Sequence, residues 1–71
     1  MIRMYQDRLA SYRVYVSEWI FRDDDYQDYL ESIIMRDVES LKRHDYHHEI
    51  VELRLQFESL YQLLRLKPYL P

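Results

Sequence analysis

The fold of this chain is decided by residues 46–66, which read YHHEIVELRLQFESLYQLLRL. Apolar side chains recur there every three or four residues, the period of one helix face, and a second apolar set falls on the opposite side. The first set, the inner stripe, consists of Tyr46, Ile50, Leu53, Phe57, Leu60 and Leu64. The second set, the outer stripe, consists of Val51, Leu55, Leu63 and Leu66. A chain this short closes one internal core, so we predict that the outer stripe is an interface.

The same apolar period predicts two further helices. They cover residues 2–21 and 25–43, with the third helix over residues 46–66 and a tail at residues 67–71. The connections are short, so consecutive helices run antiparallel. We therefore predict a single all-α domain over residues 1–71, a small antiparallel three-helix bundle. The alternative is a helical hairpin that dimerises into a four-helix bundle, because the period alone does not distinguish the two arrangements.

The residues at the expected helix ends support this assignment. Glycine is absent, and the two prolines are Pro68 and Pro71, so the usual turn residues are missing from most of the chain. Their absence argues against β-structure and long loops. Asp24 is followed three residues later by Gln27, which predicts a capping box at the start of the second helix. Asp45 is the expected N-cap of the third helix.

The composition limits how this domain is stabilised and where it works. With 71 residues the chain is at the lower limit for independent folding, and it has no cysteine for a disulfide or a thiolate zinc site. We therefore expect association to contribute stability, with a homodimer as the expected form. No apolar run approaches the ~18 residues of a membrane span, and the first residues do not form a secretory signal. These features favour a cytoplasmic protein without a membrane span.

One charged residue interrupts the apolar face of the second predicted helix. Asp37 lies between Ile34 and Leu41 on this face, and burial of an unpaired carboxylate is costly. Folding the first helix back on the second places Arg13 level with Asp37. We therefore predict a partly buried, structural Arg13–Asp37 ion pair that fixes the register of the two helices. The alternative is an Asp37 side chain exposed at the edge of the bundle.

Several basic and titratable side chains meet at the expected connection between the second and third helices. This basic corner consists of Lys42, Arg43, His44, His47 and His48. The opposite end of the bundle is expected to hold Asp23, Asp24, Asp25 and Asp28. The basic corner is a candidate site for a phosphate or a charged partner, although acids at a helix start and bases at its end also compensate the helix dipole. The histidine spacing does not match a zinc-protease motif, and we predict no metal.

The chain has eight tyrosines, a residue type that is enriched at protein interfaces. Five of them fit the apolar stripes and are expected in the core: Tyr5, Tyr12, Tyr26, Tyr46 and Tyr61. Other aromatic and apolar residues lie beside the stripes: Tyr15, Tyr29, Tyr69, Met4, Met35, Val14 and Phe21. We predict that a cluster of these residues, with Val14, Tyr15 and Phe21 in it, joins the outer stripe as an interface.

These features favour a non-catalytic protein–protein interaction module, a small intracellular regulator or inhibitor that acts through an apolar and tyrosine-rich helical surface. Its expected partner is another protein, a second copy of the chain, or both. The alternative is nucleic-acid association through the basic corner, but the net charge is −3 and the arginines alternate with carboxylates. The sequence has no glycine-rich phosphate loop and no supported Ser–His–acid order, so we expect neither enzyme activity nor a cofactor.

Overall fold

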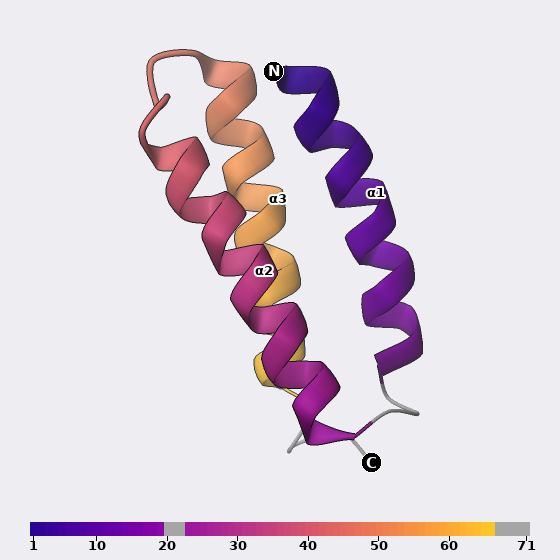
Figure 1. Ribbon diagram of the computed structural model, residues 1–71. Helices are drawn as coiled ribbons and strands as arrows, with labels where there is room; N and C mark the ends of the chain where they lie inside the picture. Colours follow the sequence, from indigo (N-terminus) through magenta and orange to yellow (C-terminus); the bar gives the residue numbers. More distant parts are fainter. Residues whose placement is uncertain (20–22, 67–71) are drawn as a thin grey trace.

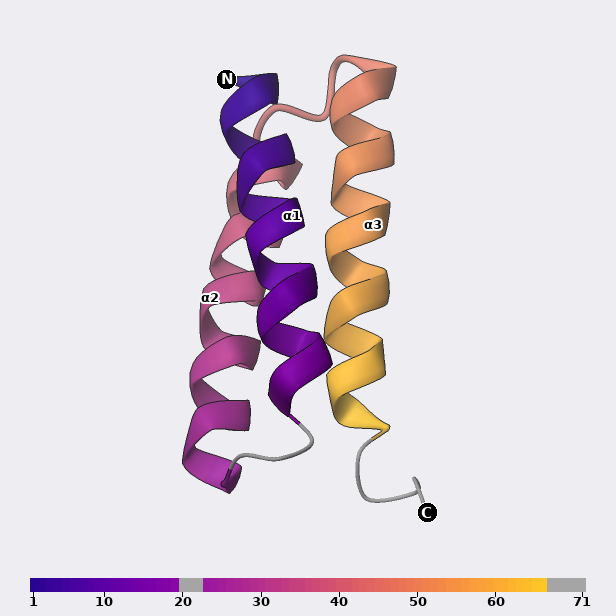
Figure 2. The same ribbon diagram turned by 90° about the vertical axis from the view of Figure 1, so that its right-hand side faces the viewer.

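Three helices make up the part of the chain that the structure, a computed structural model, describes, which is residues 1–19 and 23–66. They are α1 (Ile2–Trp19), α2 (Asp24–Lys42) and α3 (His48–Arg65). α1 and α2 run antiparallel, and α3 is antiparallel to α2 and parallel to α1 (Figures 1 and 2). Each helix packs against the other two, so the predicted small antiparallel three-helix bundle is confirmed.

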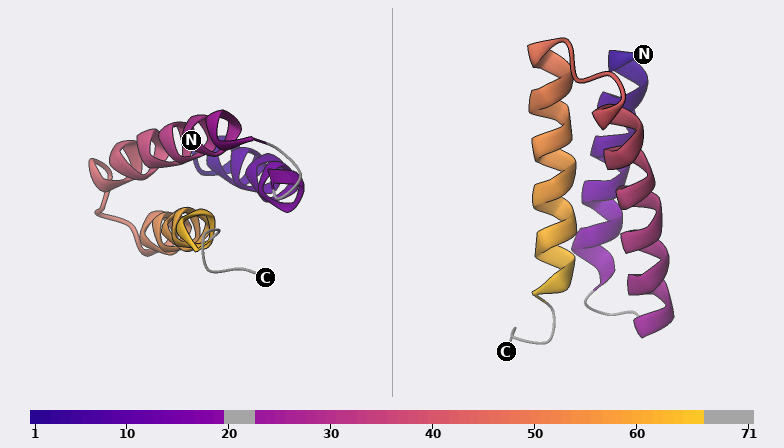
Figure 3. Two further views of the ribbon diagram at one scale, coloured as in Figure 1. Left: turned by 90° about the horizontal axis from the view of Figure 1, so that it is seen from below. Right: turned by 90° about the vertical axis from the view of Figure 1, so that its left-hand side faces the viewer.

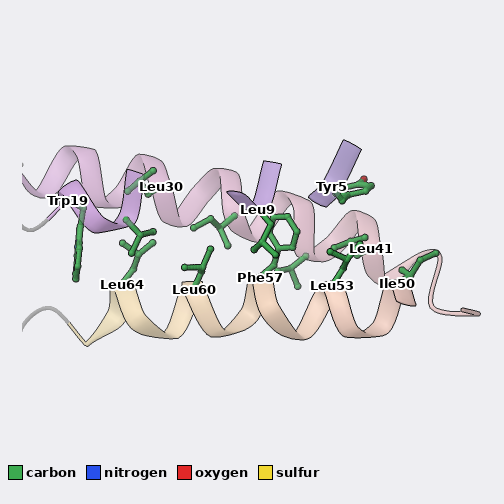
Figure 4. Close-up of a cluster of buried hydrophobic side chains, with 13 residues drawn as sticks. Tyr5, Leu9, Trp19, Leu30, Leu41, Ile50, Leu53, Phe57, Leu60 and Leu64 are labelled. Atoms are coloured by element: carbon green, nitrogen blue, oxygen red, sulfur yellow. The ribbon is translucent and has the colours of Figure 1, made fainter. Parts of the chain in front are cut away.

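The core is formed by one apolar face of each helix. The fully buried ring of Phe57 in α3 meets the rings of Tyr5 and Tyr12 from α1 edge-on, at centroid distances of 6.3 and 5.8 Å. Figure 4 shows the buried side chains of α3 pointing towards the other two helices, namely Ile50, Leu53, Phe57, Leu60 and Leu64. The buried apolar residues are Tyr5, Leu9, Val16, Trp19, Leu30, Ile34, Val38, Leu41, Ile50, Leu53, Phe57, Leu60 and Leu64. Removing these side chains from water is the main favourable contribution to folding.

α2 begins one residue earlier than predicted, and its N-cap is Asp23 rather than Asp24. Asp23 is extended (φ −79°, ψ 175°), and its Oδ1 accepts a hydrogen bond from the backbone N–H of Tyr26 at 3.0 Å. The predicted capping box of Asp24 and Gln27 is therefore wrong, because the first of three consecutive aspartates takes the cap. Gln27 instead donates from Nε2 to the backbone oxygen of Leu64 at 3.0 Å, and this bond joins α2 to α3.

The connection between α2 and α3 is longer than predicted and covers residues 43–47. The N-cap of α3 is His47, which is extended (φ −133°, ψ 131°) and accepts a hydrogen bond at Nδ1 from the Glu49 backbone N–H at 3.2 Å. The predicted cap at Asp45 is therefore wrong. Tyr46, predicted as part of the inner stripe, lies in this turn with 78% of its surface exposed. The apolar period continues back through Tyr46, but the His47 cap starts the helix two residues later.

The outer ends of α1 and α3 differ slightly from the prediction. α1 is described as far as Trp19, so its predicted extension to Phe21 lies outside the described residues. α3 ends at Arg65 with Leu66 as its C-cap. The predicted tail at residues 67–71 also lies outside the described residues. Among the described helices, none has the length and apolar character needed to cross a membrane.

The bundle is elongated, with extents of 38 × 19 × 17 Å. Seen along the bundle, α3 lies against both α1 and α2, and these two helices share a broad face that is turned away from α3 (Figure 3). The start of α1 and the α2–α3 connection lie at one end of the molecule (Figure 1). The start of α2 and the end of α3 lie at the other. This arrangement leaves two large helical surfaces for contacts, the outer side of α3 and the shared face of α1 and α2.

Candidate interaction surfaces

Asp37 is the buried charged residue of the described chain, with 3% of its surface exposed. Both of its carboxylate oxygens accept hydrogen bonds from α1. Arg8 donates from Nη1 to Oδ1 at 2.9 Å, and the Tyr12 hydroxyl donates to Oδ2 at 2.8 Å. Hydrogen bonds to an ionised group are stronger than neutral ones and offset part of the cost of burying the charge. Asp37 thereby joins the middle of α2 to α1.

The predicted Arg13–Asp37 ion pair is wrong. Arg13 is directed towards α3, where its Nη2 donates to Oε1 of Gln56 at 3.0 Å. The predicted level along the helices was nearly correct, because Tyr12, the residue next to Arg13, contacts Asp37. The error was in the helix face, since one residue turns a side chain by about 100°. Arg8 and Tyr12 are four residues apart and share the face towards α2, a pairing that the sequence analysis missed.

The contact with Asp37 also changes the acidity of Tyr12. Burial, followed by the hydrogen bond and negative charge of Asp37, raises the Tyr12 pKa from its ordinary value of 10.0 to about 12. The positive charge of Arg8 acts in the opposite direction. The Arg8 guanidinium also lies 5.4 Å from the centroid of the Tyr5 ring, a cation–π contact. The Tyr12 hydroxyl therefore keeps its proton, and with it the hydrogen bond to Asp37, to a higher pH than an ordinary tyrosine would.

The outer stripe of α3 remains in contact with solvent. Leu55 and Leu66 each expose 50% of their surface and Leu63 exposes 41%, whereas Val51 is half-buried. Leu63 is turned towards α1 and lines a shallow hollow there with Arg13, Gln56, Ser59 and Leu60. Polar side chains of α3 separate Leu55 from the two C-terminal leucines. The outer stripe is therefore two apolar patches rather than a continuous band.

The predicted interface residues of α1 fall on different faces. Val14 exposes 53% of its surface and Tyr15 exposes 40%, while Phe21 lies outside the described residues. Val14 and Tyr15 are adjacent, so their directions differ by about 100°. The Tyr15 ring lies 6.3 Å from that of Tyr12, on the side of α1 that faces α2. Tyr29 of α2, which exposes 58% of its surface, is also close enough to affect Tyr12 electrostatically.

The basic corner is on the surface, and several of its members make local contacts. Lys42 pairs with Glu39 at 3.5 Å, one turn earlier on α2. Arg43 is exposed and forms the C-cap of α2. The half-buried His44 ring meets the Tyr46 ring at a centroid distance of 6.1 Å, nearly perpendicular to it. Lys42 therefore has an acidic neighbour and His44 an aromatic one.

The two remaining histidines of the corner stack on each other at the start of α3. Their ring centroids are 5.6 Å apart and their planes differ by 11°. His47 uses its Nδ1 to cap α3, and His48 is the first residue of the helix. Within residues 1–19 and 23–66, no three His, Cys, Asp or Glu side chains are placed to hold one metal ion. The observed role of His47 is thus to start a helix.

Comparison of this chain with protein-family models, with curated proteins and with solved structures found no match.

The surfaces of the bundle offer two main kinds of contact. Half-exposed leucines on the outer side of α3 suit an apolar partner surface. Tyrosines and arginines on the shared face of α1 and α2 belong to the residue types that contribute most to protein–protein binding.

Proposed function

We propose that this protein is a non-catalytic interaction module, a small intracellular regulator or inhibitor, that acts by docking on another protein. The docking surface is the outer stripe of α3, formed by Val51, Leu55, Leu63 and Leu66. One observation carries this proposal. Leu55 and Leu66 each leave half of their surface in water, although the core is already formed by other side chains. The folded monomer therefore leaves apolar surface on α3 that its own core does not cover.

Covering this surface is energetically favourable. Burying a leucine side chain completely contributes about 1.5–3 kcal/mol relative to full exposure. Leu55 and Leu66 are half exposed, so a partner that covers them gains roughly 1 kcal/mol from each. The hollow beside Leu63 offers a further place for a partner side chain. Exposed polar residues such as Glu52 and Gln62 surround the leucines, which gives an apolar centre with a polar rim.

The proposal is tested by capturing partners from the cells that make the protein. We expect Leu55→Glu and Leu66→Glu to lose a protein that the unmodified chain retains, because a carboxylate would be buried without a counter-charge. Gln6→Glu, at an exposed position of α1, is the matched control and should retain it. Far-UV circular dichroism should show the same helix content in all variants. An identical set of captured proteins for the unmodified chain and both leucine variants would refute docking through this stripe.

A further inference from the structure

The face of α1 and α2 that is turned away from α3 presents the same order of side chains on both helices. Starting from the end where α1 finishes and α2 begins, each helix presents an acid, a tyrosine, a serine and then an arginine. All eight side chains are exposed. On α1 they are Glu18, Tyr15, Ser11 and Arg8, and on α2 they are Asp25, Tyr29, Ser32 and Arg36. We call this surface the banded face.

Spacing and contacts place these residues on one side of the molecule. Successive members are three or four residues apart, so each set of four forms a stripe along its helix. Arg8 binds Asp37, the neighbour of Arg36 in α2, so the arginines of the two stripes lie at a similar level along the bundle. Tyr15 lies against Tyr12, the second residue that contacts Asp37. α3 packs on the other side of both helices (Figure 3).

We propose that the banded face binds a second copy of this chain across a twofold axis. Each of the two helices then lies antiparallel to its equivalent in the second copy. A twofold interface needs a surface that complements itself. The banded face meets this condition, because a twofold rotation that reverses the direction of the helices places its acids opposite its arginines. Glu18 faces Arg8 of the second copy, and Asp25 faces Arg36 of the second copy. This contact uses a different face from the outer stripe of α3.

The distances along the two helices suit a single axis. Glu18 and Arg8 are ten residues apart, and Asp25 and Arg36 are eleven residues apart. At a rise of 1.5 Å per residue these separations are about 15 and 16.5 Å. Because the two arginines lie at a similar level and the two spans are nearly equal, the midpoints of the two stripes are also nearly level. One twofold axis, running across both helices in the plane of the contact, can therefore cross both stripes at their midpoints. All four acid–arginine pairs then form at once.

The tyrosines lie close to these midpoints, each opposite a small residue. With the axis midway between acid and arginine, Tyr15 lies over Ser11 of the second copy, and Tyr29 lies over Ser32 of the second copy. Ser11 is part of a shallow hollow along α1 whose lining also includes Arg8, Tyr12 and Tyr15. A tyrosine ring of the second copy fits this hollow with its hydroxyl directed to water. Aromatic and arginine anchors of this kind dominate the energy of protein interfaces.

Charge determines the orientation of the two copies. A parallel twofold arrangement would place α1 on α2 of the second copy, acids on acids and arginines on arginines, which is unfavourable. Glu18, Asp25 and Arg36 form no ion pair with any other described residue, so their charges are available to a second copy. Arg8 is bound to Asp37 through one nitrogen, and a guanidinium has further N–H groups to donate.

The test is a charge exchange followed by sedimentation equilibrium over a range of protein concentrations. The unmodified chain should dimerise. Asp25→Arg and Arg36→Glu should each weaken the dimer at least about tenfold, because each places like charges opposite each other. An equimolar mixture of the two variants should dimerise again, since one copy then supplies two acids and the other two arginines. Glu52→Arg, the same reversal of charge at an exposed position of α3, is the matched control and should leave the dimer unchanged.

Three results would overturn the proposal. The first is an unmodified chain that stays monomeric at about 1 mM, a limit that excludes all but very weak association. The second is a dimer that neither charge variant weakens, or one that the mixture of variants does not restore. The third is a dimer that Leu55→Glu dissociates while Asp25→Arg does not, which would assign the self-contact to α3. Docking on another protein through the outer stripe is tested separately, by capture from cells. A failure of the dimer proposal therefore does not refute that docking, and a failure of the docking does not refute the dimer.

Discussion

Asp37 shows how a single buried carboxylate sets the position of one helix on another. Its two oxygens accept hydrogen bonds of 2.9 and 2.8 Å from Arg8 and Tyr12. Both bonds form only when these two residues of α1 lie at the level of Asp37 along α2. Apolar contacts alone tolerate small shifts of packed side chains. Removing one partner of a buried charge typically costs about 3–5 kcal/mol, because the other is left without compensation. The Asp37 cluster therefore favours one register of α1 against α2.

Replacing Tyr12 by phenylalanine tests this cluster through its pH dependence. Tyr12→Phe removes one hydrogen bond to Asp37 and should lower the free energy of unfolding by about 1–2 kcal/mol at neutral pH. The pKa of Tyr12 is about 12 in the folded chain and near 10 when unfolded. Above pH 10 the unfolded chain loses this proton more readily, so the unmodified protein loses stability as the pH rises from 10 to 12. The stability difference between the two proteins should therefore shrink over this range.

The measurement is urea unfolding at several pH values, followed by the fluorescence of the single, buried tryptophan, Trp19. Tyr46→Phe is the control, because Tyr46 is largely exposed in the α2–α3 connection and its ring contacts His44 rather than the Asp37 cluster. The control should show the same pH dependence as the unmodified protein. A stability difference between the Tyr12→Phe variant and the unmodified protein that stays constant from pH 10 to 12 would contradict the assigned role of Tyr12.

At this scale the sequence identified the important residue but not its partners. Asp37 stood out because it interrupts an apolar face, which is a property of the helix period alone. Its partner depends on the rotation of α1 about its own axis, and that rotation is set by the packing of Tyr5 and Tyr12 against Phe57. Arg13 had the right level and charge but lies on the side of α3.

The start of α3 is held by an unusual cap at the scale of the element. The preferred N-cap residues are Asn, Asp, Ser and Thr, whereas α3 uses the imidazole of His47. The observed bond needs an unprotonated Nδ1, because only that form accepts from the Glu49 N–H. A protonated imidazole would also place a positive charge beside the positive end of the helix dipole. The chain thus begins α3 with a cap that is weaker than a hydroxyl or carboxylate.

We expect His47→Ser to stabilise the protein. A serine hydroxyl accepts from the N–H groups of the first turn without carrying a positive charge, and a good cap in place of a poor one contributes about 0.5–1 kcal/mol. For a domain of this size the melting temperature should rise by roughly 3–6 °C. Thermal unfolding followed by far-UV circular dichroism measures the change. His48→Ser, one residue into the helix, is the control and should be nearly neutral. A lower melting temperature for His47→Ser would show that the stacked His47–His48 pair stabilises more than the cap.

The helices were predictable because each repeats its apolar period over several turns, so many side chains support the same conclusion. Their ends were less predictable because one side chain decides each of them. Asp23, Asp24 and Asp25 are all good caps, and the period did not distinguish among them. At the start of α3, Asp45 is the better cap by residue type, yet His47 takes the position.

At the scale of the whole molecule, Phe57 joins all three helices. It belongs to α3, is completely buried and receives two tyrosine rings from α1. It also belongs to the same buried cluster as Leu30, Ile34 and other residues of α2. A domain of this length is stable by about 4–11 kcal/mol in total. The contacts of one aromatic ring are therefore a large share of what keeps this chain folded.

Phe57→Ala should leave the protein barely stable. Replacing a buried phenylalanine with alanine costs about 3–5 kcal/mol, because contacts are lost and a cavity remains. The melting temperature should fall by roughly 15–30 °C, and the unfolding transition should lose cooperativity. Thermal unfolding measured by Trp19 fluorescence and circular dichroism tests this expectation. Gln62→Ala, at an exposed position of the same helix, should change the melting temperature by no more than a few degrees. A Phe57→Ala protein that melts like this control would contradict the central role of the ring.

The exposed leucines of α3 were predictable because the sequence has two apolar sets on one helix and one core to fill. The hollow beside Leu63 was not, since Leu63 is turned towards α1 and only the packed structure shows where α1 lies. The banded face was also missed. Its two halves read in opposite directions along the chain, from Arg8 to Glu18 and from Asp25 to Arg36, and they match only when the helices are placed antiparallel.

The odd number of helices in the described part of the chain has a simple mechanical consequence. The first turn of α1 and the last turn of α3 lie at opposite poles of a body 38 Å long (Figure 1). A tether joined ahead of α1 and another joined behind α3 would leave in opposite directions. The bundle would then keep its two attachment points apart by its own length. In a helical hairpin or an antiparallel four-helix bundle, both attachment points would lie at the same end.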